Sequence, residues 1–190
     1  MRLVIFVNHR GTITLKSDRL ILRRINANDA LEIYNGFVNQ RDFLYYANKE
    51  KRTLQEEIDS LKGIDKKYEN KEYYNWVITL KDTNEIIGSI NVNCNDLIVD
   101  NINYAVDERF SNNGYMSEAL KIVIDFFFTT VGVLEIYCGC CVENKASKKV
   151  MIKNGMNLVE IKKSYIKLCD GFHDMYLFNI KKEGYEDGRK

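Results

Sequence analysis

The part of the sequence best suited to chemistry is a polar turn that contains a glycine and leads into a helix. The turn spans Ser111 to Gly114, and the apolar residues after it recur at the three- and four-residue spacing of a helix: Met116, Leu120, Val123 and Phe127. The first backbone N–H groups of such a helix are unpaired and lie in a locally positive field, so the turn could bind a phosphate. Taken alone, it is more typical of an ordinary strand-to-helix turn capped by Ser111 or Asn112.

The residues around this turn resemble motif A of the GNAT acyltransferase superfamily. The family pattern is Arg/Gln-x-x-Gly-x-Gly/Ala at the start of a helix, and here its place is taken by Ser111-Asn112-Asn113-Gly114-Tyr115-Met116. Ser117-Glu118-Ala119-Leu120 then completes a Gly-Tyr-x-Ser-Glu-Ala-Leu segment. That segment resembles the branch of the family that acetylates protein N-termini, including those of ribosomal proteins.

Other family landmarks follow in the same order along the chain. Glu143-Asn144-Lys145-Ala146-Ser147 resembles the Asn-x-Ala-Ser signature, and Lys153-Asn154-Gly155-Met156 resembles the Lys-x-Gly-Phe signature. Upstream, residues 15–23 resemble the first strand and residues 76–92 the central hairpin. The resemblance covers roughly residues 14–181, and several landmarks at family spacing are far more specific than one loop.

The resemblance implies direct transfer of an acetyl group from acetyl-coenzyme A to an amine within a ternary complex. In the family, backbone amides of the turn bind the pyrophosphate, and the pantetheine arm enters between two parallel strands that splay apart. Carried onto this sequence, the resemblance implies the following cofactor-binding residues: Tyr104, Val106, Ser111, Asn112, Asn113, Gly114, Tyr115, Met116, Ser117, Asn144 and Ser147.

Two residues of the turn depart from the family pattern. Ser111 replaces the usual Arg or Gln, and Met116 replaces a small residue at a point where the backbone passes close to the ligand. The Met116 side chain could narrow the phosphate cradle, or it could point into the core as the first apolar residue of the helix. Neither change removes the main-chain N–H groups that would bind the phosphate.

Acetyl transfer from a thioester to an amine needs a neutral amine held nearby, a donor for the oxyanion and stabilisation of the departing thiolate. The backbone N–H near Val106, at the end of its strand, is the expected oxyanion donor. Asn144 and Ser147 are the expected catalytic side chains. The amide of Asn144 could hydrogen-bond the pantetheine arm, and Ser147 could reach the thioester sulfur. Asn144 also fits a simple N-cap of the helix that follows it.

Many relatives carry a general acid, a tyrosine, seven positions after this asparagine, and Met151 stands there instead. Since Met151 cannot donate a proton, Ser147, a water or another tyrosine takes the role, or the thiolate leaves on hydrogen bonds alone. The candidate tyrosines are Tyr104, Tyr115, Tyr137 and Tyr176. No general base is assigned. Asp100, Glu135 and Glu143 lie near the expected cleft in sequence order, and His173 is expected to be structural.

Composition is typical of a single globular domain. The chain has 190 residues, of which 45% are hydrophobic, enough for one substantial core. We expect an N-terminal arm (1–13), one acetyltransferase domain (14–182) and a polar C-terminal tail (183–190). Within the arm, the apolar run Leu3–Val7 is expected to pack on the domain or, as the alternative, to form an edge strand.

Charge and cysteine content exclude several function classes. With 28 basic and 27 acidic residues, nucleic-acid binding is not expected, and no run approaches the ~20 apolar residues of a membrane span. The five cysteines include Cys138, Cys140 and Cys141 on one expected strand, but no second Cys/His pair stands at zinc spacing. We therefore expect buried structural cysteines, no metal and a reducing, cytoplasmic location.

The elements that must position these residues follow from periodicity and capping signals. Strands are expected at residues 19–25, 76–80, 86–94, 97–106, 134–141, 158–168 and 175–180. Helices are expected at residues 28–38, from the Thr53-x-x-Glu56 capping box toward Tyr68, from 112 onward and at 144–153. This order predicts a mixed, mostly antiparallel α/β sheet of about seven strands flanked by helices, with the splayed parallel pair implied by the resemblance.

Together these features predict an acetyl-coenzyme A-dependent N-acetyltransferase that acts on a primary amine, with a protein N-terminal α-amine as the first choice. One alternative is a small-molecule amine, such as a polyamine or an antibiotic. A second is a non-catalytic acyl-coenzyme A-binding protein, which Met116 and Met151 favour and which Gly114, Asn144 and Ser147 oppose. A homodimer is left open, and the early helices carry no readable signature of the acceptor.

Overall fold

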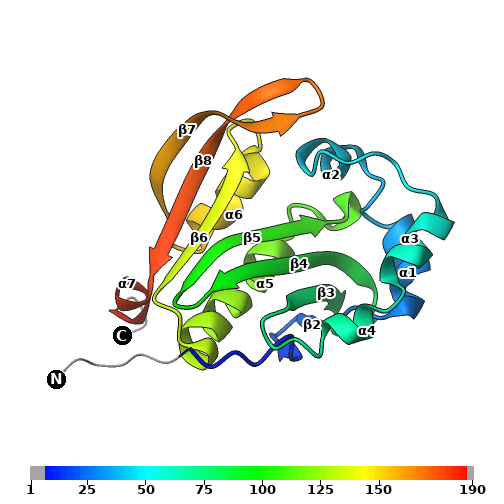
Figure 1. The fold of residues 1–190 in the computed structure, drawn as a ribbon, viewed down its shortest axis with the longest axis horizontal. Helices are drawn as coiled ribbons and strands as arrows, with labels where there is room; N and C mark the ends of the chain where they lie inside the picture. Colours follow the sequence, from blue (N-terminus) through cyan, green and yellow to red (C-terminus); the bar gives the residue numbers. More distant parts are fainter. Residues whose placement is uncertain (1–6, 188–190) are drawn as a thin grey trace.

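An eight-stranded mixed sheet organises the computed structural model, which describes residues 7–187 (Figure 1). Its strands are β1 (Leu15–Lys16), β2 (Leu20–Arg24), β3 (Tyr74–Leu80), β4 (Ile86–Asn95), β5 (Ile98–Val106), β6 (Glu135–Cys141), β7 (Asn157–Leu168) and β8 (Gly171–Lys181), in the order β1-β2-β3-β4-β5-β6-β8-β7. Every neighbouring pair is antiparallel except β5 and β6. The expected fold class is confirmed, with the short β1 added to the seven expected strands.

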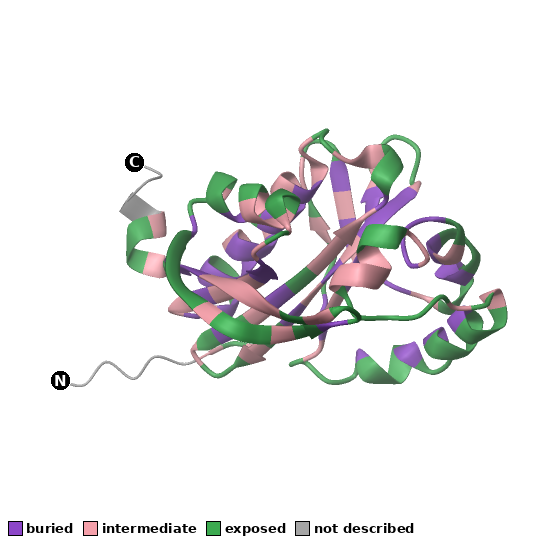
Figure 2. Cartoon of the chain, turned by 90° about the horizontal axis from the view of Figure 1, so that it is seen from above, coloured by how far each residue is buried: buried purple, intermediate pink, exposed green. Residues whose placement is uncertain are grey.

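Helices cover both faces of this sheet. The described residues form α1 (Ala30–Asn35), α2 (Arg41–Tyr46), α3 (Leu54–Leu61), α4 (Ile64–Lys67), α5 (Tyr115–Phe126), α6 (Lys145–Lys153) and α7 (Lys182–Asp187). On β3, Trp76 and Ile78 pack with the buried face of α5, whereas Val77 between them packs with α1, α3 and α4. Successive strand residues point to opposite faces, so the core is divided into two clusters, one on each side of β3. Figure 2 shows buried residues concentrated in the strands and exposed ones on the outward sides of the helices.

Two helical segments differ from the sequence-based expectation, and two helices, α2 and α7, are unexpected. The segment from Thr53 toward Tyr68 is two helices, because Gly63 adopts a left-handed φ of +72° between α3 and α4. The helix expected to reach residue 38 ends earlier, with Gly36 as its C-cap. No side chain caps the start of α2 at Gln40, and its six residues are too few for a periodic signal.

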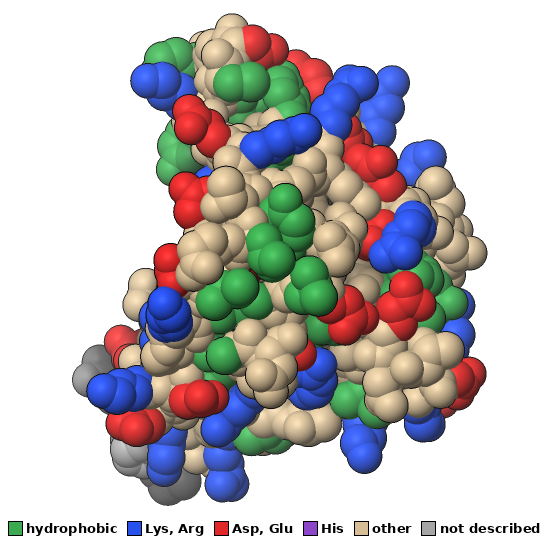
Figure 3. Space-filling model, turned by 90° about the vertical axis from the view of Figure 1, so that its right-hand side faces the viewer, with side chains coloured by type: hydrophobic (Ala, Val, Ile, Leu, Met, Phe, Trp, Pro, Cys, Tyr) green, Lys and Arg blue, Asp and Glu red, His purple; other side chains and the backbone are tan. Residues whose placement is uncertain are grey.

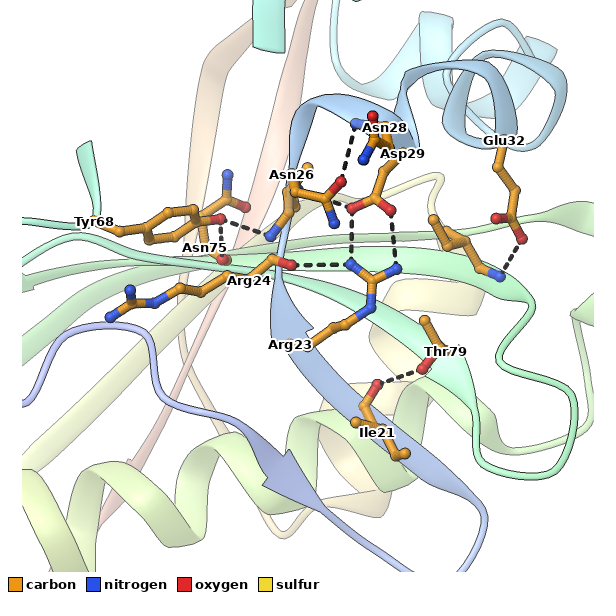
Figure 4. A network of polar contacts seen from close by, with 12 residues as sticks. Ile21, Arg23, Arg24, Asn26, Asn28, Asp29, Glu32, Tyr68, Asn75 and Thr79 are labelled. Carbon is orange, nitrogen blue, oxygen red and sulfur yellow. Dashed lines mark hydrogen bonds and ion pairs between the residues drawn. The ribbon is translucent and has the colours of Figure 1, made fainter. Parts of the chain in front are cut away.

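A largely buried ion pair fixes α1 relative to β2. Arg23 on β2 donates two hydrogen bonds to Asp29, at 2.8 and 2.9 Å, and Asp29 completes a capping box with Asn26 (Figure 4). On α1 itself, Glu32 accepts a hydrogen bond of 2.6 Å from the backbone N–H of Ile86. Charge-assisted, two-pronged contacts of this kind are among the stronger hydrogen bonds in proteins. They hold in place the segment that leads to α2, which forms one wall of the site described below.

The two ends of the described chain lie against the rest of the fold. In the expected N-terminal arm, Asn8 N–H donates to Val131 O at 2.8 Å, and Trp76 Nε1–H donates to Ile13 O at 2.7 Å. Residues 3–6, most of the apolar run expected to pack or to form an edge strand, lie outside the described residues. The segment expected to be a polar tail begins within α7.

The surface shown in Figure 3 mixes basic and acidic side chains around a central group of hydrophobic ones. A nucleic-acid-binding face usually carries a field of one sign, and this face does not. Within residues 7–187, no helix has both the length and the apolar character needed to cross a bilayer.

Candidate active site

The parallel strands β5 and β6 separate soon after they meet. They pair only at Ile98 with Glu135 and at Val99 with Ile136. Beyond this point β5 stays paired with β4, up to Val106, and β6 stays paired with β8, up to Cys141. The splay implied by the family resemblance is therefore present between the carboxyl-terminal halves of the two strands.

A cavity of about 860 Å³ opens at this splay, within the usual size range of small-molecule sites. Of the predicted cofactor residues, its lining includes Tyr104, Val106, Ser111, Met116, Asn144 and Ser147. The others do not line it and form the adjoining turn and the first turn of α5: Asn112, Asn113, Gly114, Tyr115 and Ser117. The structure thus brings the turn, the ends of both strands and the start of α6 together around one opening.

The end of β5 that carries Val106 is held very close to β4. Gly88 on β4 lies opposite Val106, and a Cβ built on Gly88 would collide with the carbonyl oxygen of Ala105, so only glycine fits opposite Val106. The next residue, Asp107, donates its backbone N–H to Ile87 at 2.8 Å. This close pairing fixes the backbone of the expected oxyanion donor.

The turn before α5 leaves the helix N-terminus without a side-chain cap. Gly114 is the N-cap residue, with a left-handed φ of +78°, and no side chain of the described chain accepts a hydrogen bond from the start of the helix. The alternative of a cap by Ser111 or Asn112 is therefore wrong. Instead, the amide of Asn113 donates to the carbonyls of Phe110 and Ser111, which braces the turn. The free N–H groups of a twelve-residue helix remain available to an anion.

Two cations that we did not identify from the sequence flank this turn. A Cβ built on Gly114 would lie 3.7 Å from both Arg19 Nη2 and Lys153 Nζ. Glu118 on α5 accepts from Arg19 Nε at 2.7 Å and from Ser17 Oγ at 2.7 Å. Burial alone would raise the pKa of Glu118, but these hydrogen bonds outweigh it and hold the pKa below its usual value. Glu118 therefore stays ionised at neutral pH and fixes Arg19 beside the turn.

Met116 points into the core rather than filling the turn. It is 7% exposed and belongs to the hydrophobic cluster under α5, while part of its surface lines the cavity. Of the two orientations considered for this residue, the core orientation is the one observed.

A tyrosine from β5 meets the serine of α6 inside the cavity. The hydroxyl of Tyr104 lies 2.7 Å from Ser147 Oγ. Burial raises the pKa of Tyr104 well above its usual value, so the phenol stays protonated at any physiological pH. Met151 is fully buried in the core and cannot reach the opening. Among the candidate tyrosines, Tyr104 is therefore the one whose hydroxyl meets Ser147 in the cavity.

The expected N-cap function of Asn144 is confirmed. Its Oδ1 accepts the backbone N–H of Ser147 at 2.9 Å, which satisfies one of the free donors of α6. Its Nδ2 makes no hydrogen bond to any described residue, and Asn144 lines the cavity. The side chain can therefore cap the helix with its oxygen and donate to a ligand with its nitrogen.

Of the remaining candidate acids and bases, only some lie at the cavity. The other tyrosines are engaged outside the lining: Tyr115 beneath Arg19, Tyr137 with Glu135, and Tyr176 beneath Lys148. Asp100 lines the cavity, whereas Glu135, Glu143 and His173 do not. His173 instead lies between Asp170 and Glu143.

One wall of the cavity comes from α2, which was not predicted. Asp42, Phe43 and Tyr46 line it. Gln40, just before the helix, donates to Asp107 at 2.9 Å and accepts from the backbone N–H of Glu108 at 2.9 Å. These contacts tie the wall to the end of β5. Because α2 has no capping side chain and is too short to show a helical repeat of apolar residues, the sequence carries no signal for it.

Comparison with known families identifies the fold and its chemistry. The model of the GNAT acetyltransferase domain matches residues 19–157, which span most of the chain. The chain belongs to the GNAT family of acetyltransferases. A curated relative of this acetyltransferase, the uncharacterized N-acetyltransferase YoaA of Bacillus subtilis (strain 168), is 26% identical over 170 residues, which cover 88% of this chain and 96% of the relative.

Solved structures share the fold of this acetyltransferase at low identity. The ribosomal-protein-S5-alanine acetyltransferase of Vibrio fischeri superposes with a TM-score of 0.78 at 19% identity, covering 91% of this chain and 98% of that one. The Microcin C7 self-immunity acetyltransferase MccE, in complex with acetyl-CoA and AMP, superposes with a TM-score of 0.75 at 17% identity. The match covers 87% of this chain and 93% of that one. At these identities the likeness concerns the fold alone.

The two uses of Asn144 can be separated by substitution. Asn144→Asp keeps an oxygen for the cap but loses the Nδ2 donor, whereas Asn144→Ala loses both. We expect both variants to raise the KM for acetyl-coenzyme A by about five- to twentyfold, and only Asn144→Ala to lower the melting temperature. Steady-state kinetics and thermal unfolding measure the two effects. Unchanged kinetics in both variants would leave Asn144 as a cap alone.

Proposed function

We propose that this acetyltransferase transfers the acetyl group of acetyl-coenzyme A to a protein N-terminal α-amine by direct attack in a ternary complex. The observation that carries the proposal is the cavity at the β5–β6 splay, with an uncapped helix N-terminus beside it and the Tyr104–Ser147 pair within it. An acyl carrier with a phosphate at one end and a thioester at the other suits this arrangement.

In this proposal the pyrophosphate binds at the turn before α5. The free N–H groups of the helix provide donors, and Arg19 and Lys153 provide positive charge near Gly114. The family pattern places an Arg or Gln where this chain has Ser111. Arg19 and Lys153 therefore offer, from two other elements, the charge that the turn itself lacks.

A substitution at Gly114 tests this assignment. We expect Gly114→Val to weaken coenzyme A binding at least tenfold, because a branched side chain would enter the space beside the free N–H groups. Gly63→Val is the matched control, since Gly63 has a similar φ of +72° and nothing within 4 Å of an added Cβ. Isothermal titration of both folded variants measures the affinities. Equal affinities for the two would overturn the assignment of the turn.

The proposed reaction joins the amine nitrogen to the acetyl carbon and breaks the bond from that carbon to sulfur. The backbone N–H of Val106 would stabilise the oxyanion. The departing thiolate would accept a hydrogen bond or a proton from Ser147, and Ser147 would regain that proton from the neutral Tyr104 hydroxyl at 2.7 Å. The proton lost by the attacking amine would then return through solvent to Tyr104, so that both hydroxyls end the cycle protonated.

Paired substitutions test this relay. Ser147→Ala is expected to lower kcat about 10²-fold while changing the KM for acetyl-coenzyme A little, and Tyr104→Phe to lower kcat by less. Because the two hydroxyls act as one unit, the double variant should be hardly slower than Ser147→Ala. Steady-state rates of the three variants and the wild type give the comparison. Multiplicative losses in the double variant would show that the hydroxyls act separately.

The acceptor is proposed from the chemistry of its amine. The described residues that line the cavity include no histidine, and none of the carboxylates among them is assigned as a general base, so the rate should depend chiefly on the acceptor's own deprotonation. An α-amine with a pKa of about 7.7–8.0 is about a quarter to two fifths neutral at pH 7.5, whereas a lysine with a pKa of about 10.4 is about 0.1% neutral. An α-amine is therefore the favoured acceptor at neutral pH.

One observation favours a small polyamine as the second candidate acceptor. Asp42, Asp100 and Glu108 line the cavity, and their negative charges would attract a molecule that carries several amines. The non-catalytic alternative is opposed by the Tyr104–Ser147 pair.

A panel of acceptors distinguishes these cases. At pH 7.5 we expect a peptide with a free N-terminus to be acetylated at least tenfold faster than the same peptide with a blocked N-terminus and an internal lysine. The rate with the free peptide should rise with pH until the α-amine is neutral. Mass spectrometry of the products locates the acetyl group. Faster turnover of spermidine would move the polyamine ahead, and no turnover with any amine would favour the binding protein.

A further inference from the structure

A cysteine, a glutamate and a histidine converge where β6 ends beside β8. Cys141 is the last residue of β6 and is 3% exposed, Glu143 lies in the turn that follows, and His173 lies on β8. Cys141 pairs with Met175, so His173, two residues earlier on β8, continues on the same side of the sheet. One potential ligand atom from each of the three residues lies within 4.8 Å of the other two.

The imidazole is oriented in the way that metal-binding histidines are. Its Nε2 lies 2.9 Å from Asp170 Oδ1, and its Nδ1 lies 3.5 Å from Glu143 Oε1. Asp170 is held in turn by the hydroxyl of Tyr45, which donates to Oδ2 at 3.0 Å. A carboxylate that accepts the N–H of one ring nitrogen leaves the lone pair of the other nitrogen free for a metal. Here that lone pair faces Glu143.

Zinc suits this set of donors. It binds cysteine sulfur at about 2.3 Å and histidine nitrogen or carboxylate oxygen at about 2.0–2.2 Å, so tetrahedral ligand atoms lie about 3.3–3.7 Å apart. The separation of His173 Nδ1 and Glu143 Oε1 already fits. Cys141 Sγ and Glu143 Oε2 lie 2.6 Å apart and would have to separate by about 1 Å. The Glu143 side chain is 52% exposed and can turn outward.

We propose that Cys141, Glu143 and His173 bind one zinc ion, with Asp170 as a positioning residue for His173. On binding, the Cys141 thiol releases its proton to solvent and its sulfur bonds to the metal. Three protein ligands leave one coordination position open, as in zinc sites that are not purely structural. Cys141 also lines the acetyltransferase cavity, so the ion would lie at its wall. The proposal replaces the expectation of no metal and does not depend on the identity of the acceptor.

Titration of the metal-free full-length protein with zinc chloride, in competition with a chromophoric chelator, tests the site. We expect one zinc ion per wild-type chain. Affinity should fall at least tenfold in Cys141→Ser and in His173→Gln, and about tenfold in Asp170→Asn. Two matched controls should bind like the wild type: Cys169→Ser, which removes an exposed thiol next to Asp170, and His9→Gln, which removes the other histidine of the chain.

Cobalt substitution gives an independent readout of the sulfur ligand. The Co²⁺ complex of the wild type should show a thiolate-to-cobalt charge-transfer band, and Cys141→Ser should lack it. Circular dichroism of the metal-free variants shows whether they are folded. If Cys141→Ser does not fold, His173→Gln still tests the site, because the His173 side chain lies outside the core. Wild-type affinity no higher than that of His173→Gln, a cobalt complex without the band, or equal losses in the control variants would overturn the proposal.

Discussion

The site depends on one interruption of hydrogen bonding, the early separation of β5 from β6. Two neighbouring strands normally continue to pair, because unpaired backbone N–H and C=O groups are costly away from water. Here each strand keeps its other neighbour, so only the groups that face the opening lack a strand partner. Those groups are presented to whatever fills the cavity. An amide-rich arm such as pantetheine could pair with them as a strand would.

The splay is maintained by contacts at both of its ends. Near the point of separation, the thiol of buried Cys138 donates to Ile102 O at 3.2 Å. At the wide end, Tyr104 reaches across to Ser147 at the start of α6. The contact that spans the gap is therefore also the one that brings a hydroxyl to the expected thioester. Removing it would affect the geometry and the chemistry together, which is why the kinetic comparison rests on paired variants.

The sequence predicted the strands and helices that carry the site because each has a local signal. Alternation of apolar residues predicts β5 and β6, the glycine turn predicts α5, and the asparagine cap predicts α6. Each element lies within a few residues of its expected place. Contacts between distant elements have no such signal. The approach of Arg19 and Lys153 to Gly114 depends on the relative placement of β2, α5 and α6. The same holds for α2, whose position rests on the contacts of Gln40 with the end of β5.

Where this chain departs from the family pattern, groups of similar chemistry lie nearby but come from other parts of the fold. Met151 cannot donate a proton, but Tyr104 on β5 brings a hydroxyl to within 2.7 Å of Ser147 on the same helix. Ser111 carries no charge, but two cations from other elements lie beside the turn. Spacing rules could not have pointed to the proposed zinc site for the same reason, because the pairing of β6 with β8 unites residues that are far apart in the chain. A missing motif residue therefore argues against an activity only where no other group of the same chemistry lies within reach of the same atom.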